Sequence, residues 1–339
     1  MRNCLLNLFF ALQAFVLSAQ ISLSGYQEEL LNPALRSSYW SAHWIACPNV
    51  APNAYGVYHF RKQITLQEQP AHYVVHVSAD NRYKLYVNGQ LVSLGPARCD
   101  IYNWNFETVD LAPYLHEGKN TLAAVVWNYA EQRPVAQISF NQTGFLVQGN
   151  TEAEAEANTD ASWRCWRDEA YSPWNEWQVL GYYVAGPGEQ LDAARYPWGW
   201  ELPDYDDHAW QPAVAGLRAA MKGTRDYPGR LLVPRPIPPM ELRLERLAQV
   251  RAVEGVQCPE GFPAVRKALT IPAHTEARLL LDNDSLTTGY FSVAFSGGKA
   301  AELRIAYAEA LYQGNPEQTV KSYHLNAKGD RNEIADKEF

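Results

Sequence analysis

The 339-residue sequence has few charged residues and no excess of basic ones. Asp, Glu, Lys and Arg make up 19% of the chain, against about 25% in an average globular protein. The 29 Lys and Arg face 37 Asp and Glu, which leaves a net charge of −8. This composition excludes an intrinsically disordered chain, and without a basic stripe it argues against a nucleic-acid-binding protein.

Short motifs of the common catalytic and metal sites are also missing from the sequence. We find no G-x-S-x-G, no phosphate-binding loop and no H-E-x-x-H. His72 and His76 have the spacing of a helical metal site, but they flank a β-rich run that would hold them about 13 Å apart. Four clustered carboxylates could form an acid–base pair, but a solvated turn is the favoured interpretation: Glu201, Asp204, Asp206 and Asp207.

Long apolar runs are absent apart from one at the N-terminus. Arg2 precedes an apolar stretch over residues 5–17, and Ser18 and Ala19 follow it. This arrangement predicts a signal peptide over residues 1–19 and a linker over 20–37, with export to the periplasm or the extracellular space. The alternative is a buried N-terminal helix. No later segment has the roughly 18 apolar residues of a membrane helix, so no membrane span is predicted.

Cysteine is scarce, and one of the five cysteines, Cys4, falls within the predicted signal peptide. Four remain, and none of them form a C-x-x-C pair: Cys47, Cys99, Cys165 and Cys258. Four cysteines allow three disulfide pairings, and the sequence neither chooses among these nor excludes free thiols.

Aromatic residues and β-rich segments are what the sequence has in abundance, with 11 Trp, 20 Tyr and 11 Phe. Residues 83–87 alternate between apolar and polar side chains, and a second β-rich run covers residues 90–94. Asn88 and Gly89 lie between them, and Asn-Gly is the strongest short signal for a hairpin. Short strands, Gly and Asn turns and few helices predict an all-β protein built from β-sandwiches.

A proline-rich stretch divides the sequence into two predicted domains. Four prolines within residues 234–239 favour an extended connector, which we place at 226–240. The first β-sandwich is predicted at 38–225 and the second, expected to be incomplete, at 241–339. Further strands are expected at 138–148, 178–184, 277–281, 290–295 and 301–310. A second hairpin is expected at Gly297–Gly298, and residues 152–157 are interpreted as a loop or frayed turn.

Three sets of motifs carry a resemblance to a known family. The first joins residues 58–62 to the run SADNRYKLYVNG at 78–89. The second is GEQLDAAR at 188–195 followed by DYDDHAW at 204–210. The third covers residues 279–312, and the tail at 328–334 fits as well. From about residue 41 to 339, the chain resembles the N-terminal β-domains of bacterial α-L-rhamnosidases.

The resemblance implies a jelly-roll, galactose-binding-like domain followed by a concanavalin-like one. In that family, a large (α/α)6 barrel after these domains hydrolyses the rhamnoside with two carboxylates and inversion. Nothing here matches that barrel, so no catalytic residue is carried over and the chain is expected to be inactive alone. The resemblance implies the non-catalytic N-terminal portion of an exported enzyme. The full-length enzyme would release terminal α-L-rhamnosyl residues from plant polysaccharides or glycosides, and its barrel would be the partner of these domains.

Some domains of this kind bind rhamnose through a calcium ion. Asp80 and Asn81 are at the matching place, and Asn128 and Pro134 could supply later oxygen ligands, since Ca²⁺ prefers carboxylate, amide and carbonyl oxygens. The alternative is that Asp80 and Asn81 simply form a turn. The aromatic candidates for stacking on the sugar, which could equally belong to the core, are Trp104, Trp127 and Tyr129. The alternative function is therefore a stand-alone calcium-dependent rhamnose-binding module.

Overall fold

The computed structural model describes residues 30–174, 188–305 and 307. The chain divides into two compact units, which meet in the sequence at Arg243 and Leu244. Regular structure in the described ranges is mostly β, and the helices found there are short 3-10 turns. Within these ranges, no helix has the length and apolar character to cross a membrane. The predicted signal peptide and the predicted strand at 178–184 lie outside the described residues.

The first sheet of the N-terminal unit has six strands in the order β13-β1-β8-β3-β6-β14. Neighbouring strands are antiparallel except β14 and β6, which are parallel. β3 is buried at every position, as expected for a strand covered on both faces. The strands are β1 (Tyr39–Ala46), β3 (Val74–Asp80), β6 (Trp104–Asp110), β8 (Gly144–Gly149), β13 (Val214–Ala220) and β14 (Leu232–Pro234).

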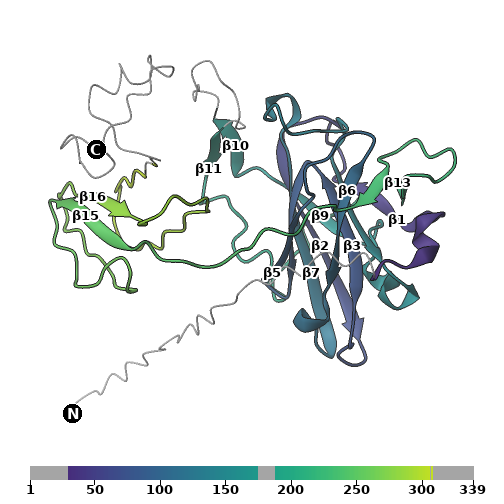
Figure 1. Cartoon of the computed structure of the whole chain (residues 1–339), viewed down its shortest axis with the longest axis horizontal. Coiled ribbons are helices and arrows are strands. Elements are labelled where there is room, and N and C mark those ends of the chain that lie inside the picture. The colour runs from purple at the N-terminus through teal and green to yellow at the C-terminus, as the bar shows by residue number, and fades with distance from the viewer. Residues whose placement is uncertain (1–29, 175–187, 306, 308–339) are drawn as a thin grey trace, which may run out of the picture. The chain divides into compact units, whose positions relative to one another are not determined.

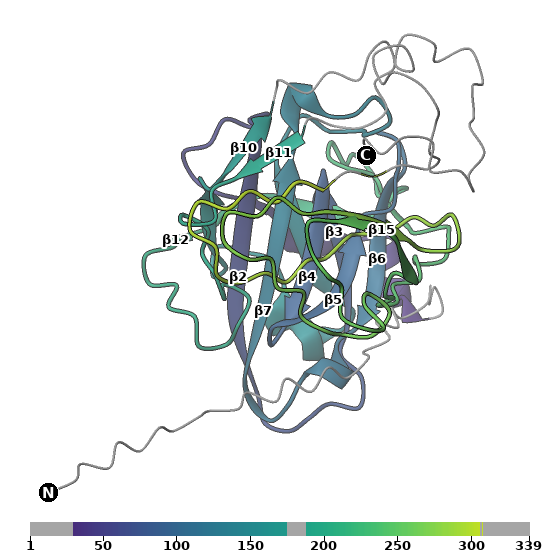
Figure 2. The ribbon, with the colours of Figure 1, turned by 90° about the vertical axis from the view of Figure 1, so that its left-hand side faces the viewer.

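The second sheet also has six strands, in the order β12-β9-β2-β7-β4-β5, and Figure 2 shows β2, β7, β4 and β5 side by side. All of its pairs are antiparallel. The strands are β2 (Gly56–Leu66), β4 (Arg82–Val87), β5 (Gln90–Gly95), β7 (Gly118–Asn128), β9 (Arg164–Asp168) and β12 (Gln211–Pro212). A separate ribbon pairs β10 (Tyr171–Trp174) with β11 (Gly188–Leu191) (Figure 1).

Apolar side chains from both sheets meet in one buried cluster. Phe60 of β2 and Phe145 of β8 are fully buried and stacked, with their ring centroids 5.4 Å apart. Val77 of β3 and Leu85 of β4 belong to the same cluster of buried residues. Each fully buried side chain of this size contributes about 1.5–3 kcal/mol. The two sheets therefore pack against each other across this core.

The predicted hairpin at Asn88–Gly89 is confirmed. It joins β4 to β5, Val87 pairs with Gln90 across the turn, and both turn residues have positive φ, 50° and 81°. The Asn88 amide adds three hydrogen bonds to the turn: it donates to Tyr114 O and Asn120 Oδ1 and accepts from Thr121 N. Two-residue hairpins require this backbone conformation, which Asn and Gly adopt most easily.

Several local predictions for the N-terminal unit need correction. Residues 152–157 form a 3-10 helix, η5 (Glu152–Ala157), which a reciprocal capping box between Thr151 and Glu154 stabilises. The strand expected at 138–148 begins only at Gly144. Part of the predicted connector, Leu232–Pro234, forms the edge strand β14, a position where proline is tolerated.

The described end of the predicted linker is also folded. η2 (Pro33–Arg36) is capped by Asn32, whose Oδ1 accepts a hydrogen bond from Ala34 N at 3.0 Å. Leu31 is 3% exposed and belongs to a core cluster that includes Trp40. Residues 30–37 are therefore part of the N-terminal unit.

The second unit contains one antiparallel pair in its described residues, β15 (Gln249–Glu254) with β16 (Arg278–Asp282). The strand expected at 277–281 is confirmed as β16. The expected hairpin at Gly297–Gly298 is wrong, because residues 290–295 and 301–305 form no strand. An isolated two-stranded ribbon offers little surface against which further alternating segments can pack. The jelly-roll and concanavalin-like assignments stay predictions.

Candidate functional site: the Asp80–Arg230 cluster

Asp80 and Asn81 lie where the chain passes from the first sheet to the second. β3 ends at Asp80 and β4 begins after Asn81. Both side chains are fully buried, and the peptide bond between them is cis. Asn81 N donates to Trp127 O at 2.8 Å, and Asn81 Oδ1 accepts from Tyr129 N at 2.8 Å. These bonds tie the crossing point to the end of β7.

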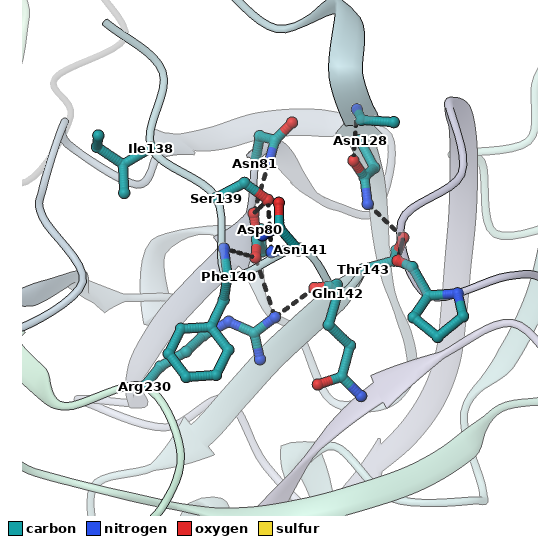
Figure 3. Close-up of polar contacts among 12 residues, drawn as sticks. Asp80, Asn81, Asn128, Ile138, Ser139, Phe140, Asn141, Gln142, Thr143 and Arg230 are labelled. Atoms are coloured by element: carbon teal, nitrogen blue, oxygen red, sulfur yellow. Dashed lines mark hydrogen bonds and ion pairs between the residues drawn. The ribbon is translucent and has the colours of Figure 1, made fainter.

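Both carboxylate oxygens of Asp80 accept hydrogen bonds (Figure 3). Oδ1 accepts from Ser139 Oγ at 2.9 Å and from the Asn81 amide. Oδ2 accepts from Phe140 N at 2.7 Å and from Arg230 Nη2 at 3.1 Å. A buried carboxylate requires partners of this kind, because an unpaired charge in the core is strongly destabilising.

Arg230 supplies the positive charge of the cluster from 150 positions further along the chain. Its side chain is 4% exposed, and Nη2 also donates to Gln142 O. Burial lowers the pKa of Arg230, while the Asp80 charge opposes that shift. The guanidinium carbon lies close to three aromatic ring centroids: Trp44 at 4.3 Å, Phe140 at 5.2 Å and Trp104 at 5.5 Å.

Asn128 is near this cluster, but its amide bonds to other groups (Figure 3). Its Nδ2 donates to Thr143 Oγ1 at 2.7 Å, and its Oδ1 accepts from Ala130 N at 2.8 Å. The carbonyl oxygen of Pro134 accepts from Gln137 N at 2.8 Å. The structure thus brings Asp80, Asn81 and Asn128 together, but their oxygens do not converge on a common point.

This arrangement does not fit a calcium ion. Ca²⁺ requires six to eight oxygen ligands, whereas the oxygens of Asp80, Asn128 and Pro134 face N–H and O–H donors. The cation next to Asp80 is the guanidinium of Arg230. Elsewhere in the described ranges, no group of three or more His, Cys, Asp and Glu side chains could hold a metal.

The three aromatic candidates for sugar stacking lie in different environments. Trp104 is fully buried and packs edge-to-face against Phe140, so it presents no face to a ligand. Trp127 is half-buried, and Lys84 Nζ lies 5.5 Å from its ring centroid. Tyr129 is half-buried beside Asn81. For Trp127 and Tyr129, sugar stacking stays a prediction.

The acidic turn near Trp210 binds arginine side chains. Asp207 Oδ2 lies 3.0 Å from Arg61 Nε, and Asp207 Oδ1 lies 3.6 Å from Arg164 Nε. Arg61 is nearly fully buried and also donates to the carbonyl oxygens of Trp200 and Leu202. These contacts neutralise Asp207, which suits a structural clamp rather than a general acid or base.

Residues 188–210, which carry the second set of motifs, cover part of the second sheet. Trp200 and Trp210 pack in one cluster with Val57 of β2 and with Ala123 and Val125 of β7. β11 begins the first motif, and Asp192 N donates to Ala170 O at 2.9 Å. Trp200 and Trp210 therefore hold this segment on the sheet, while the first motif pairs with β10 in the separate ribbon.

Two arginines of these sites, Arg61 and Arg230, were not singled out by the sequence analysis. Each is the buried partner of an Asp more than 140 positions away. Arg61 falls within the motif at residues 58–62, but that motif did not predict its burial, and no motif includes Arg230. The acidic motif at residues 204–210 could have predicted that Asp207 has a cationic partner such as Arg61, because a carboxylate in a fixed position requires a cation or a hydrogen-bond donor.

His72 and His76 do not meet, in agreement with the strand prediction. His76 is buried, with Nδ1 3.0 Å from Thr108 Oγ1 and Nε2 3.0 Å from Asn150 Oδ1. His72 is exposed, and its Nδ1 lies 2.8 Å from Asp110 Oδ2. Both imidazoles therefore have structural partners.

Residues 68–243 match the family described as the α-L-rhamnosidase N-terminal domain, which is more than half of the chain. The chain belongs to this family, as the motifs predicted. An α-L-rhamnosidase of Streptomyces avermitilis is 26% identical over 201 residues, which are 52% of this chain and 16% of that protein.

Solved structures are also similar to this chain. The GH78 family rhamnosidase of Bacillus sp. GL1 is 26% identical, with a TM-score of 0.50, and the match covers 66% of this chain and 23% of that one. The Streptomyces avermitilis α-L-rhamnosidase complexed with L-rhamnose matches with a TM-score of 0.36 at 21% identity, covering 68% of this chain and 18% of that one. The chain thus spans less than a quarter of each of these relatives.

Proposed function

We propose that this chain is a non-catalytic N-terminal portion of an exported α-L-rhamnosidase. The observation that carries the proposal is the family match over residues 68–243, which includes the motifs at 188–195 and 204–210. The whole enzyme would release terminal α-L-rhamnosyl residues from plant polysaccharides or glycosides. Its (α/α)6 barrel would perform the chemistry, and the β-domains would support that barrel.

The acidic residues of the described ranges support a non-catalytic role. Inverting hydrolysis needs two carboxyl groups about 6.5–9.5 Å apart across a pocket that holds the sugar. Asp207 is instead bound by Arg61 and Arg164, and Asp206 is exposed, with its side chain 78% accessible. Glu107 is buried and accepts hydrogen bonds from Tyr83 and Arg235.

An activity assay tests the proposal directly. The purified, sequence-verified 339-residue chain is incubated with p-nitrophenyl α-L-rhamnoside, with a full-length α-L-rhamnosidase as the positive control. We expect no release of p-nitrophenol by the chain alone. Release that is abolished in an Asp206→Asn, Asp207→Asn double variant would refute the proposal.

Carbohydrate binding is a second candidate function. It is favoured by two half-buried aromatic side chains at the end of β7, Trp127 and Tyr129. Aromatic faces suit the apolar face of a sugar, and Tyr adds a hydroxyl group for hydrogen bonding. Calorimetric titration of the chain with L-rhamnose, with and without CaCl₂, tests this candidate. Binding that Trp127→Ala abolishes would support it, and absence of heat at millimolar sugar would exclude it.

Export is part of the same proposal and rests on the N-terminal sequence. Arg2 followed by the apolar run at 5–17 is typical of a secretory signal. N-terminal sequencing of the protein recovered from cells tests it. We expect a mature chain that begins close to residue 20, and recovery of intact Met1 would contradict export.

A further inference from the structure

Oxygen atoms from distant parts of the chain converge beside Asp80. Asp80 Oδ2 and the carbonyl oxygen of Gln142 both bind the same atom, Nη2 of Arg230 (Figure 3). The Asp80 side chain is fully buried, and that of Arg230 is 4% exposed. The point where these oxygens meet is therefore a cation site away from solvent, and a protein side chain fills it.

We infer that the guanidinium of Arg230 takes the place of a metal ion in this cluster, so that the chain needs no calcium there. The family resemblance implied a calcium ion held by Asp80, and the structure places a covalently attached cation in contact with that carboxylate. This inference goes beyond the proposed function, because it holds whether or not the chain binds sugar.

Charge and packing explain why the Arg230 guanidinium, and not a metal ion, lies beside Asp80. One buried guanidinium balances one buried carboxylate, whereas an added Ca²⁺ would lie against Arg230 in a region where like charges repel strongly. Both oxygens accept from the same guanidinium nitrogen, Nη2, so one permanently charged group neutralises Asp80 and satisfies the Gln142 carbonyl together. The rings of Trp44, Phe140 and Trp104 surround it and add cation–π attraction.

The geometry also explains what the cation holds together. Arg230 lies between β13 and β14, Asp80 ends β3, and Gln142 belongs to the loop that precedes β8. One side chain thus links three segments of the first sheet. Gly144 permits this approach, because a Cβ there would lie 2.9 Å from Trp44 and 3.3 Å from the Arg230 guanidinium nitrogens.

The test compares thermal unfolding of the full chain in CaCl₂ and in EGTA. We expect the wild-type Tm to differ by less than about 1 °C between the two buffers, since no oxygen cage is free. Arg230→Ala should lower the Tm in EGTA and regain about 5 °C or more in millimolar CaCl₂. The variant frees Asp80 Oδ2 and the Gln142 carbonyl oxygen for an ion whose other ligands would be waters in the space left by the side chain, and a ligand that binds only the folded state raises its stability. Should the variant fail to fold in EGTA, folding on addition of CaCl₂ is the expected result.

One further variant and a luminescent probe make the result specific. Arg218→Ala removes an exposed arginine of β13 that donates to the carbonyl oxygens of Trp40 and Tyr39, and its Tm should not respond to CaCl₂. Terbium(III), a calcium probe excited by nearby Trp, should luminesce with Arg230→Ala and not with the wild type. A calcium-dependent Tm in the wild type, or no calcium response in Arg230→Ala, would overturn the inference.

Discussion

Nε of Arg61 lies 3.0 Å from Oδ2 of Asp207, across 146 positions of the sequence. Arg61 projects from β2, and Asp207 belongs to the segment that covers the second sheet. The contact shows how the acidic motif at residues 204–210 serves the fold. A carboxylate that neutralises a buried arginine holds a long irregular segment in one place.

Asp207→Asn should therefore destabilise the chain. The substitution removes the negative charge beside Arg61, and hydrogen bonds to charged groups are worth about 1.5–3 kcal/mol. Asp206→Asn is the matched control, because that neighbouring side chain is 78% exposed, and it should change stability by less than about 0.5 kcal/mol. Urea unfolding of both variants measures the difference. Equal effects at the two positions would show that Asp207 is not a clamp.

Glu107 should make the free energy of unfolding depend on pH. Burial raises its pKa to about 7, although Ala97 N, Arg235 and Tyr83 partly oppose the shift. A raised carboxyl pKa means that the folded state holds the proton more tightly. The stabilisation that protonated Glu107 gives the folded state is thus complete below the carboxyl pKa of the unfolded chain, 4.5. It is lost as the pH rises to about 7.

The measurement compares wild type with Glu107→Gln between pH 4.5 and 8. Between these pH values the variant should gain about 3 kcal/mol in free energy of unfolding relative to wild type, since each pKa unit corresponds to about 1.4 kcal/mol. Glu117→Gln, at an exposed position, is the control and should keep the wild-type profile. Parallel profiles for wild type and Glu107→Gln would disprove the buried titration.

Asn88→Ala should weaken the β4–β5 hairpin. It removes three side-chain hydrogen bonds, each worth about 1 kcal/mol, and places Ala at a φ of 50°. Asn141→Ala shares the backbone cost at φ 55°, but the Asn141 side chain is exposed. A loss of about 2–3 kcal/mol more for Asn88→Ala than for Asn141→Ala is expected in urea unfolding. Similar losses would mean that only the backbone conformation matters.

The thiols should differ in reactivity. Cys47, Cys99, Cys165 and Cys258 are free in the structure. The hydrogen bond to Cys165 and burial raise the pKa of Cys47, and burial raises the pKa of Cys99 to about 11, so the reactive thiolate is rare at both. Native-state alkylation read by mass spectrometry should modify half-buried Cys258 first and the buried Cys47 and Cys165 last. All four should react alike in urea, and fast labelling of native Cys47 would contradict its burial.

Local sequence signals identified part of the fold and the family. The Asn88–Gly89 turn was predictable because its φ values depend on the two residues themselves. The strand at 83–87 was predictable because alternation is a property of neighbouring residues. The motifs at 188–195 and 204–210 identified the family, although they did not show that Asp207 pairs with Arg61.

Partners and burial, in contrast, were decided by the tertiary structure. Trp104 lies in the core, residues 152–157 form the helix η5, and residues 290–295 form no strand. Each outcome depends on which other residues pack against the segment. The sequence by itself determined the hairpin at Asn88–Gly89, because the positive φ of both residues depends on those residues alone. Only the tertiary structure placed Arg230 against Asp80, because the charge partner of a buried carboxylate is chosen by proximity in space, and here it lies 150 positions away.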